Sequence, residues 1–445
     1  MEGKIRKELG VTLVALVITI VILIILATVT VNIVFGDAGL VRKSQLATRE
    51  TANSMEYEEE FFTSIEGYIN DALEQNTVNS NPSDPDMPDG WDNKKVTAVE
   101  SSDGKVVPVP IGFTASEAKG ENSVDGGFVI YQGTEPVNDS NVITEQEKRN
   151  QFVWIPVDEG NLNKMYEVKK ATLSQSTFGE AVTVTDVYSN LRDSGNAVGI
   201  PGETANRREP DILPDTKNGD ANTTNGINLI KSVFQIEGDE ATVLKQWAQM
   251  LVDEYDAVYR SIEKYEGFYI GRYEITGDTT TPTVQRGKSV LANQTWYALK
   301  KACSDIVNTN EAKSIMIYGN MWDETMAWVA DKGGKDVSTN SSSWGNYSNY
   351  NTENNYVEGD PEYIEGAGTI QQSGYSDYWS ANNIYDLAGN CYDFTQEAYN
   401  AERRVRRGGN CFTTGKDIPA ATRHHRVPSK PSTSDSARAA LYIVV

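Results

Sequence analysis

The sequence predicts a chain of mixed helix and strand, in which a long apolar helix precedes an irregular, loop-rich body. An uncharged apolar run at residues 11–35 predicts the first helix. Short β-like runs bounded by turn residues predict strands in the body, at 105–111, 127–131 and 152–157. Two stretches carry strong helical patterns, at 240–263 and 294–306. Two long polar stretches between these elements are predicted loops, at 176–228 and 339–374.

Composition narrows the class of protein. The 445 residues carry a net charge of −23, which repels phosphate backbones and argues against a nucleic acid target. This acidity suits either simple solubility outside the cell or carboxylates that hold a hard cation. Cys303, Cys391 and Cys411 are too few for a disulfide scaffold. The only histidines, His424 and His425, are adjacent, which argues against a histidine-rich zinc or iron site.

The N-terminal apolar run is long enough to cross a membrane. As a helix, residues 11–35 would extend ~37 Å, against a hydrocarbon core of ~30 Å. A secretory signal would have a shorter apolar region with its cleavage site after it. Here the polar leader ends in Gly10, ahead of the apolar run. The sequence therefore predicts a transmembrane helix.

The leader resembles that of the type IV prepilin family. The leader contains three basic residues, Lys4, Arg6 and Lys7. Gly10-Val11 forms its junction with the apolar run. The resemblance implies that a prepilin peptidase cuts between Gly10 and Val11 and methylates the new amine of Val11. It also implies a single-pass protein of the cell membrane, with its N-terminus inside and its C-terminal domain at the cell surface. Ala15 stands where the family usually has Glu, which favours a display anchor or a tip-like minor subunit over a regular pilus subunit.

Four segments follow from these patterns: a leader at 1–10, a transmembrane and stalk helix at 11–75, a linker at 76–95, and a domain at 96–445. The stalk is predicted from apolar residues at helical spacing, Met55, Phe62, Ile65, Ile69 and Leu73. The linker is rich in Asn, Ser, Asp and Pro. In the domain, the helix at 240–263 places one apolar face inward, with Leu244, Trp247, Leu251, Tyr255 and Val258.

An ordered set of phrases in the domain resembles the formylglycine-generating enzyme (sulfatase-modifying factor) family, a branch of the C-type lectin fold. The phrases occur at 152–156, 267–276, 295–298, 318–323, 383–390 and 406–410. The implied fold is α+β, loop-rich, with a small twisted antiparallel sheet and flanking helices. In the converting enzymes, two cysteines after the Arg-Gly-Gly phrase bind copper. Here only Cys411 lies nearby, and Asp417 and Ile418 stand near the second position, so a copper-dependent oxidase is not expected.

The C-terminal segment, 408–445, resembles the variable region of diversity-generating retroelement target proteins. A framework of apparently fixed residues runs through Arg407-Gly408-Gly409, Pro419-Ala420-Ala421, Arg423, Pro428 and Ala437-Arg438-Ala439. Oddly assorted residues lie between these points: Cys411, Phe412, Thr414, Lys416, Asp417, Thr422, His424, His425, Arg426, Val427, Lys430, Ser432, Thr433 and Ser434. The resemblance implies that they contact a ligand. The alternative is an ordinary final pair of strands with a polar loop.

Two further features have open interpretations. By resemblance, Asp386 and Asp393 would bind a structural Ca²⁺ through their carboxylates, and Gly389 and Cys391 through backbone carbonyls. The alternative is a tight turn satisfied by its own hydrogen bonds. The basic cluster Arg403, Arg404, Arg406 and Arg407 either contacts an anion or pairs internally with acidic loops, and we favour internal pairing.

These patterns together predict a membrane-anchored, non-catalytic display protein that binds a protein or glycan ligand. No cofactor is required, and Ca²⁺ is the candidate structural ion. The alternative is a minor pilin or pseudopilin with a structural or adhesive domain, for which pilin subunits would be partners. A less favoured alternative is the copper-dependent oxidase.

Overall fold

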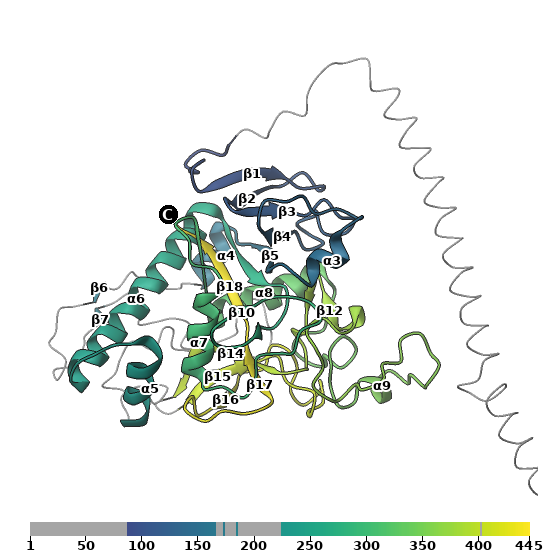
Figure 1. Cartoon of the computed structure of the whole chain (residues 1–445). Coiled ribbons are helices and arrows are strands. Elements are labelled where there is room, and N and C mark those ends of the chain that lie inside the picture. The colour runs from purple at the N-terminus through teal and green to yellow at the C-terminus, as the bar shows by residue number, and fades with distance from the viewer. Residues whose placement is uncertain (1–86, 166–171, 174–183, 186–223, 401–402) are drawn as a thin grey trace, which may run out of the picture. The chain divides into compact units, whose positions relative to one another are not determined.

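The computed structural model describes residues 87–165, 172–173, 184–185, 224–400 and 403–445, and shows a mixed α+β body dominated by sheets and loops (Figure 1). Among these residues, no helix is long and apolar enough to cross a membrane. The predicted leader, transmembrane and stalk segments lie outside the described residues, as does most of the linker. The described end of the linker packs on the body, where the ring of Trp91 lies 5.7 Å from that of Tyr265.

A six-stranded antiparallel sheet forms the centre of the body, in the order β11-β18-β8-β5-β4-β3. Its strands are β3 (Phe113–Ala115), β4 (Val129–Gln132), β5 (Gln151–Pro156), β8 (Gly267–Gly271), β11 (Ala312–Met316) and β18 (Ala439–Ile443). The strands β4, β5 and β8 are buried along nearly their whole length, because side chains on both faces pack against other elements. The C-terminal strand β18 lies inside this sheet, so the end of the chain is part of the core.

A second, four-stranded sheet has the order β16-β15-β14-β17. It contains β14 (Tyr392–Asn400), β15 (Arg403–Arg407), β16 (His424–Arg426) and β17 (Asp435–Ala437). The pairs β14–β15 and β15–β16 are antiparallel, and β14–β17 is parallel. Two-stranded pairs complete the strands: β1 (Val96–Glu100) with β2 (Val106–Pro110), β6 (Thr172–Leu173) with β7 (Val184–Thr185), β9 (Thr276–Gly277) with β10 (Pro282–Thr283), and β12 (Ser380–Ala381) with β13 (Ile384–Tyr385).

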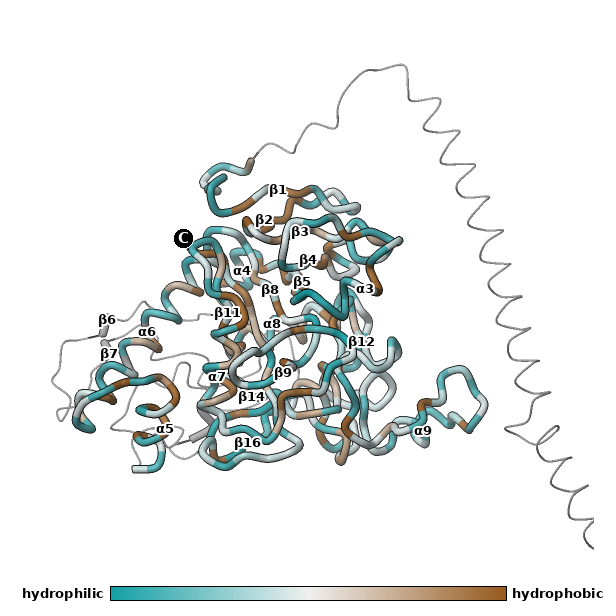
Figure 2. The backbone as a smooth tube through the Cα atoms, viewed as in Figure 1, coloured by the Kyte–Doolittle hydropathy of each residue, from teal (hydrophilic) through white to brown (hydrophobic). Residues whose placement is uncertain are grey.

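The helices include two that the sequence predicts, α6 (Glu240–Tyr265) and α7 (Trp296–Asp305). Side chains of Asp239 and Thr295 cap their N-termini, accepting from the backbone N–H groups of Thr242 and Ala298 at 2.8 and 3.2 Å. The predicted inward face of α6 is confirmed, because each of its five apolar residues is buried. Figure 2 shows the alternation of hydrophobic and hydrophilic residues along α5 (Thr224–Phe234) and α6. Shorter helices are α3 (Val142–Gln146), α4 (Glu159–Met165), α9 (Tyr350–Glu353) and the 3₁₀ turn η3 (Asp377–Trp379).

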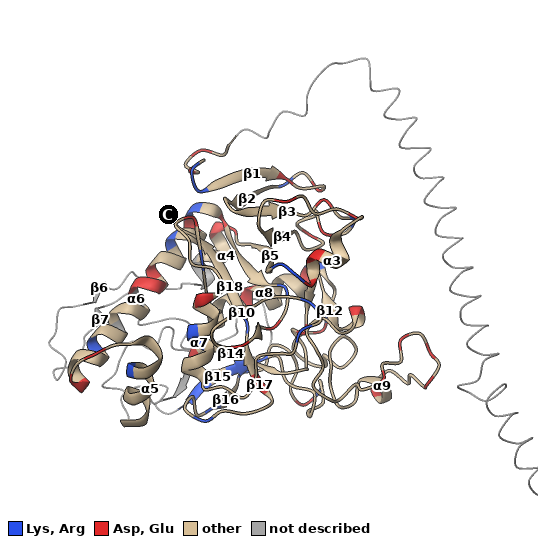
Figure 3. Ribbon diagram, viewed as in Figure 1, with Lys and Arg blue, Asp and Glu red and all other residues tan. Residues whose placement is uncertain are grey.

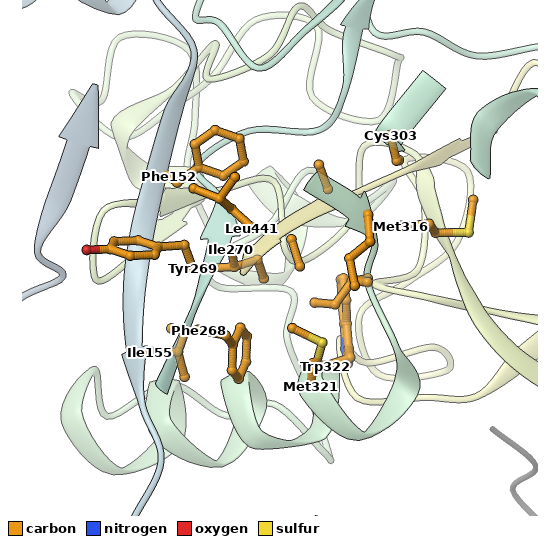
Figure 4. Close-up of a cluster of buried hydrophobic side chains, with 14 of the residues drawn as sticks. Phe152, Ile155, Phe268, Tyr269, Ile270, Cys303, Met316, Met321, Trp322 and Leu441 are labelled. Carbon is orange, nitrogen blue, oxygen red and sulfur yellow. The ribbon is translucent and has the colours of Figure 1, made fainter. Parts of the chain in front are cut away.

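The predicted strands at 105–111, 127–131 and 152–157 correspond to β2, β4 and β5. The helix α8 (Gly319–Lys332) was not predicted, because most of its residues are buried and it lacks the polar face that marks a helix in sequence. The stretch 176–228 was predicted as loop, but α5 begins inside it at Thr224. Figure 4 shows the core where β5, β8, β11 and β18 meet α8, with Trp322 and Met321 below Ile270 and Leu441.

Candidate ligand-binding surface

The C-terminal segment runs through β16, β17 and β18 and the turns that join them. Strand β16 pairs with β15, which places His424 opposite Arg406, His425 opposite Val405, and Arg426 opposite Arg404. Arginine residues gather on these two strands (Figure 3). The sheet therefore brings the basic cluster predicted from the sequence beside both histidines of the chain.

Burial divides the C-terminal segment into the same two sets that the sequence suggests. All eleven framework residues are buried, from Arg407-Gly408-Gly409 to Ala437-Arg438-Ala439. Thirteen of the fourteen predicted contact residues are exposed or half-buried, and Phe412 has 60% of its surface exposed. The exception is Cys411, whose side chain is fully buried and is not available at the surface. In an ordinary pair of strands, buried and exposed residues also alternate. Nothing in such a pair would require the buried residues to be the same ones as this framework.

A stack of rings and guanidinium groups forms the centre of the surface. The ring of Tyr392 is buried, and the guanidinium carbon of Arg406 lies 3.9 Å above its centroid. His424 stacks on Tyr392 with centroids 5.4 Å apart, and His425 stacks on His424 at 5.4 Å. Arg406 Nε donates to Nδ1 of His424 at 3.2 Å, and Arg403 lies 3.0 Å from Nδ1 of His425. Because an arginine can only donate, both rings use Nδ1 as an acceptor and carry their proton on Nε2.

Asp435 on β17 fixes the base of the stack. Its carboxylate accepts from Arg406 Nη1 through one oxygen, and its other oxygen lies 3.1 Å from Arg426 Nε. Arg426 also donates to the backbone carbonyls of Lys430 and Pro431, both at 3.2 Å. Two guanidinium groups thus share one buried carboxylate, which fixes their positions and leaves a net positive charge at this face.

A second part of the segment, the turn at 410–417, packs on the loop that precedes α9. The backbone carbonyl of Thr413 accepts from both the N–H and the hydroxyl of Ser348, at 3.0 and 2.9 Å. Inside the turn, Thr414 donates its hydroxyl to Asp417 at 2.7 Å. These contacts hold the turn in place and leave the Phe412 ring exposed.

A buried network of four charges supports the segment from below. Arg407 Nη2 lies 2.7 Å from Asp323 and 3.3 Å from Glu397, and Arg423 lies 2.5 Å from Asp323 and 3.0 Å from Glu397. Arg407 also donates to the carbonyl of Ala421. Two positive and two negative groups balance, as buried ion pairs require. Arg404 is also buried, stacked 4.1 Å over the ring of Trp296, with its guanidinium donating to the Gln396 carbonyl at 2.8 Å. Internal pairing of the basic cluster is therefore confirmed for Arg406 and Arg407.

The region predicted to bind calcium contains three buried carboxylates. Asp386 accepts from the backbone N–H of Gly374 at 2.8 Å, and Asp393 accepts from Arg438 Nε at 2.9 Å. Among the described residues, the second oxygens of Asp386 and Asp393 have no hydrogen-bond partner. Burial raises the pKa of Asp386 to about 6 and also raises that of Asp393. For Glu274, burial and the two aspartates raise the pKa well above its usual range.

Two orphaned carboxylate oxygens suit a hard cation, since they lack other partners. The guanidinium of Arg438 already places one positive charge against Asp393. In the part of the chain that the structure describes, no group of three or more His, Cys, Asp or Glu side chains is arranged to hold a metal. A site made of two carboxylates and two carbonyls, as predicted, remains a prediction.

All three cysteines are buried and unpaired. The backbone N–H of Cys411 donates to the carbonyl of Asn390, next to Cys391, at 3.0 Å. Burial raises the pKa of Cys411 to about 12 and that of Cys391 well above its usual range. At neutral pH both groups are therefore thiols rather than thiolates.

Acid should destabilise the protein through His424. Burial, with help from Arg406 and His425, lowers the pKa of His424 from 6.5 to about 4. Between pH 6.5 and 4, His424 is protonated in the unfolded chain but neutral in the folded protein. The free energy of unfolding therefore falls as the pH drops through this range. We expect His424→Gln to remove about 1–2 kcal/mol of this loss, because the ring is half-exposed and solvent screens part of the effect. Urea unfolding of the full chain at pH 4.5 and 7.5 measures it, and equal pH dependence in both proteins would contradict this assignment.

No protein-family model and no curated protein matches this chain. Among solved structures, it is similar to Treponema denticola variable protein 1, with 15% identity over 39% of this chain and 84% of that chain and a TM-score of 0.25. It is also similar to PvdO from Pseudomonas aeruginosa, with 14% identity over 40% of this chain and 81% of that chain and a TM-score of 0.20. Likenesses this distant do not assign a family.

Proposed function

We propose that this chain is a surface-displayed binding protein with a C-type lectin fold, whose C-terminal segment forms the contact surface for a protein or glycan ligand. Binding rather than catalysis is the proposed activity. The prepilin-like N-terminus would anchor the chain in the membrane and place the domain outside the cell. The proposal includes diversification of the segment, which the resemblance to variable regions implies.

The observation that carries this proposal is the division of the segment by burial. The framework is buried throughout, and thirteen of fourteen predicted contact residues reach the surface. A protein whose surface residues change while its fold persists needs this arrangement, because substitutions at exposed positions away from the core cost little stability. The buried network of Arg407, Arg423, Asp323 and Glu397 supplies a base that does not depend on those surface residues.

The surface is also suited to binding in energetic terms. The stacked rings of Tyr392, His424 and His425 and the bonds of Arg406 fix side chains before a ligand arrives, which lowers the entropy lost on binding. Aromatic and Arg side chains contribute most at binding hot spots. The proton on Nε2 of each histidine provides a donor for a ligand carbonyl or hydroxyl.

Calcium is a separate part of the proposal. Bound between Asp386 and Asp393, it would neutralise carboxylates that are otherwise buried with unpartnered oxygens. Its role would be structural, holding the turn that precedes β14. A melting temperature of the full chain that is the same in CaCl₂ and in chelator would count against it.

Replacing three residues of the surface should strongly weaken binding. We expect His424→Ala/His425→Ala/Arg426→Ala to weaken ligand binding by at least about 30-fold, since hot-spot residues contribute ~2 kcal/mol or more. Full-length chain in detergent is first screened on an array of glycans and bacterial surface proteins. The affinity of each captured ligand is then measured for the original and the variant chain.

A matched control is Lys245→Ala/Gln246→Ala/Gln249→Ala on the exposed face of α6, which should leave the affinity unchanged. Thermal melting of both variants checks that the domain remains folded. If the variant in β16 binds every captured ligand as tightly as the original chain, the surface is misassigned. Diversification has its own test in the gene: a near-copy of its 3′ end beside a reverse transcriptase gene supports it, and a pilus operon alone supports the minor pilin.

A further inference from the structure

A lobe at residues 350–379, from α9 to η3, has a composition unlike the rest of the chain. The part of the lobe around α9 projects from the body (Figure 1). The whole lobe lies within a stretch, residues 336–402, that contains no Lys or Arg. Its acidic residues are Glu353, Glu358, Asp360, Glu362, Glu365 and Asp377. In Figure 3 the lobe carries acidic residues and no basic ones. Among the described residues, an ion pair joins the lobe to the body: Arg286 lies 2.7 Å from Asp377.

The lobe also exposes apolar and aromatic side chains. Nine large hydrophobic residues are exposed in the described part of the chain, and four of them belong to the lobe: Val357, Ile370, Tyr375 and Tyr378. Their exposed fractions range from 36% at Ile370 to 64% at Val357. Four such residues within one segment of thirty, interspersed with acidic residues, mark a candidate site of interaction.

A small core that belongs to the lobe supports one of these side chains, Tyr375. Tyr350, Ile364 and Trp379 are buried together, and Asn351 bonds both backbone groups of Ile364 at 2.9 and 3.1 Å. The Tyr375 ring stacks on Trp379 with centroids 5.9 Å apart. Tyr375 is thus supported from below while about half of its surface faces solvent.

A further observation concerns Trp379, which is fully buried beneath Tyr375. Its indole N–H has no acceptor among the residues that the structure describes. A buried donor without a partner is costly, so the small core beneath Tyr375 contains an uncompensated polar group.

We propose that this lobe is a docking surface for an arginine-rich segment of a partner protein. Carboxylates attract the guanidinium groups, and the exposed faces of Tyr375 and Tyr378 bind them by cation–π stacking. The aliphatic stems of arginine pack on apolar residues such as Val357 and Ile370. The lobe is acidic, whereas the surface at β15 and β16 carries net positive charge, so this inference does not rest on the proposed function.

Binding of a fluorescein-labelled hexa-arginine peptide to the full-length chain in zwitterionic detergent tests the lobe. The Kd is measured by fluorescence anisotropy at 150 mM salt, because this salt concentration screens long-range attraction between the peptide and the acidic chain. We expect Tyr375→Ser/Tyr378→Ser to raise the Kd at least about fivefold although it changes no charge. Glu358→Gln/Glu362→Gln/Glu365→Gln should raise it about tenfold.

The control variant is Glu237→Gln/Glu240→Gln/Asp253→Asn, which removes the same charge from exposed positions at α6. It should change the Kd less than twofold, and the triple variant in β16 should leave it unchanged. No measurable binding, an unchanged Kd in the tyrosine variant, or equal weakening by the control would each overturn the proposal. A fall in peptide affinity in the β16 variant would also overturn it, since the peptide would then bind the other surface.

Discussion

Arg407→Met is expected to lower the free energy of unfolding by about 3–5 kcal/mol. The guanidinium of Arg407 is fully buried between Asp323 and Glu397. Without it, two buried carboxylates share the single charge of Arg423, and the interior carries an uncompensated negative charge. Breaking a buried pair costs this much because desolvation of the remaining charge is no longer offset. Urea denaturation of the full chain, followed by tryptophan fluorescence, measures the loss.

The matched control is Arg260→Met, which breaks an exposed pair with Asp256 at 2.6 Å. It should change stability by no more than about 0.5 kcal/mol, because surface ion pairs contribute little. The double variant Arg407→Met/Asp323→Leu removes one charge of each sign and should be less destabilised than the sum of its parts. If Arg407→Met costs no more than Arg260→Met, the network does not hold the segment.

The sequence predicted helices well where apolar residues recur at helical spacing along one face. The stripe from Leu244 to Val258 marked α6, and each residue of it is buried. The same pattern did not reveal α8, because Trp322 and its neighbours are buried on most sides and the helix has no polar face. Periodicity reports a contrast between two faces, so an element buried all round is not visible to it.

The candidate ligand-binding surface was predictable in part, because it also shows a contrast between two sets of residues. Composition separated the framework from the assorted residues between its points, and burial divides them along the same line. It placed Cys411 in the contact set, because composition alone does not reveal the direction of a side chain. The partners of Arg407 could not be predicted either, since Asp323 is 84 residues away and contact between them depends on the fold.

Gly409→Ala should destabilise the protein by about 2–5 kcal/mol, through strain and overpacking together. Gly409 has φ +74°, where a side chain is strained whatever the space. A Cβ there would lie 2.7 Å from both the carbonyl oxygen of Ile418 and Cε1 of Tyr347. The Tyr347 hydroxyl shares its one proton between the carbonyls of Gly408 and Ile418, at 2.8 and 3.0 Å, so the ring has little freedom to move.

Gly287 supplies a control that isolates the steric part of this effect. Its φ is +70°, close to that of Gly409, but a Cβ there would have no neighbour within 4 Å. Gly287→Ala should therefore show only the backbone strain, about 1 kcal/mol. The difference between the two variants in urea unfolding measures how tightly Tyr347 holds the start of the C-terminal segment. Equal losses would mean that the turn at Gly408-Gly409 yields freely, and that the framework beneath the surface is less rigid than a diversified surface requires.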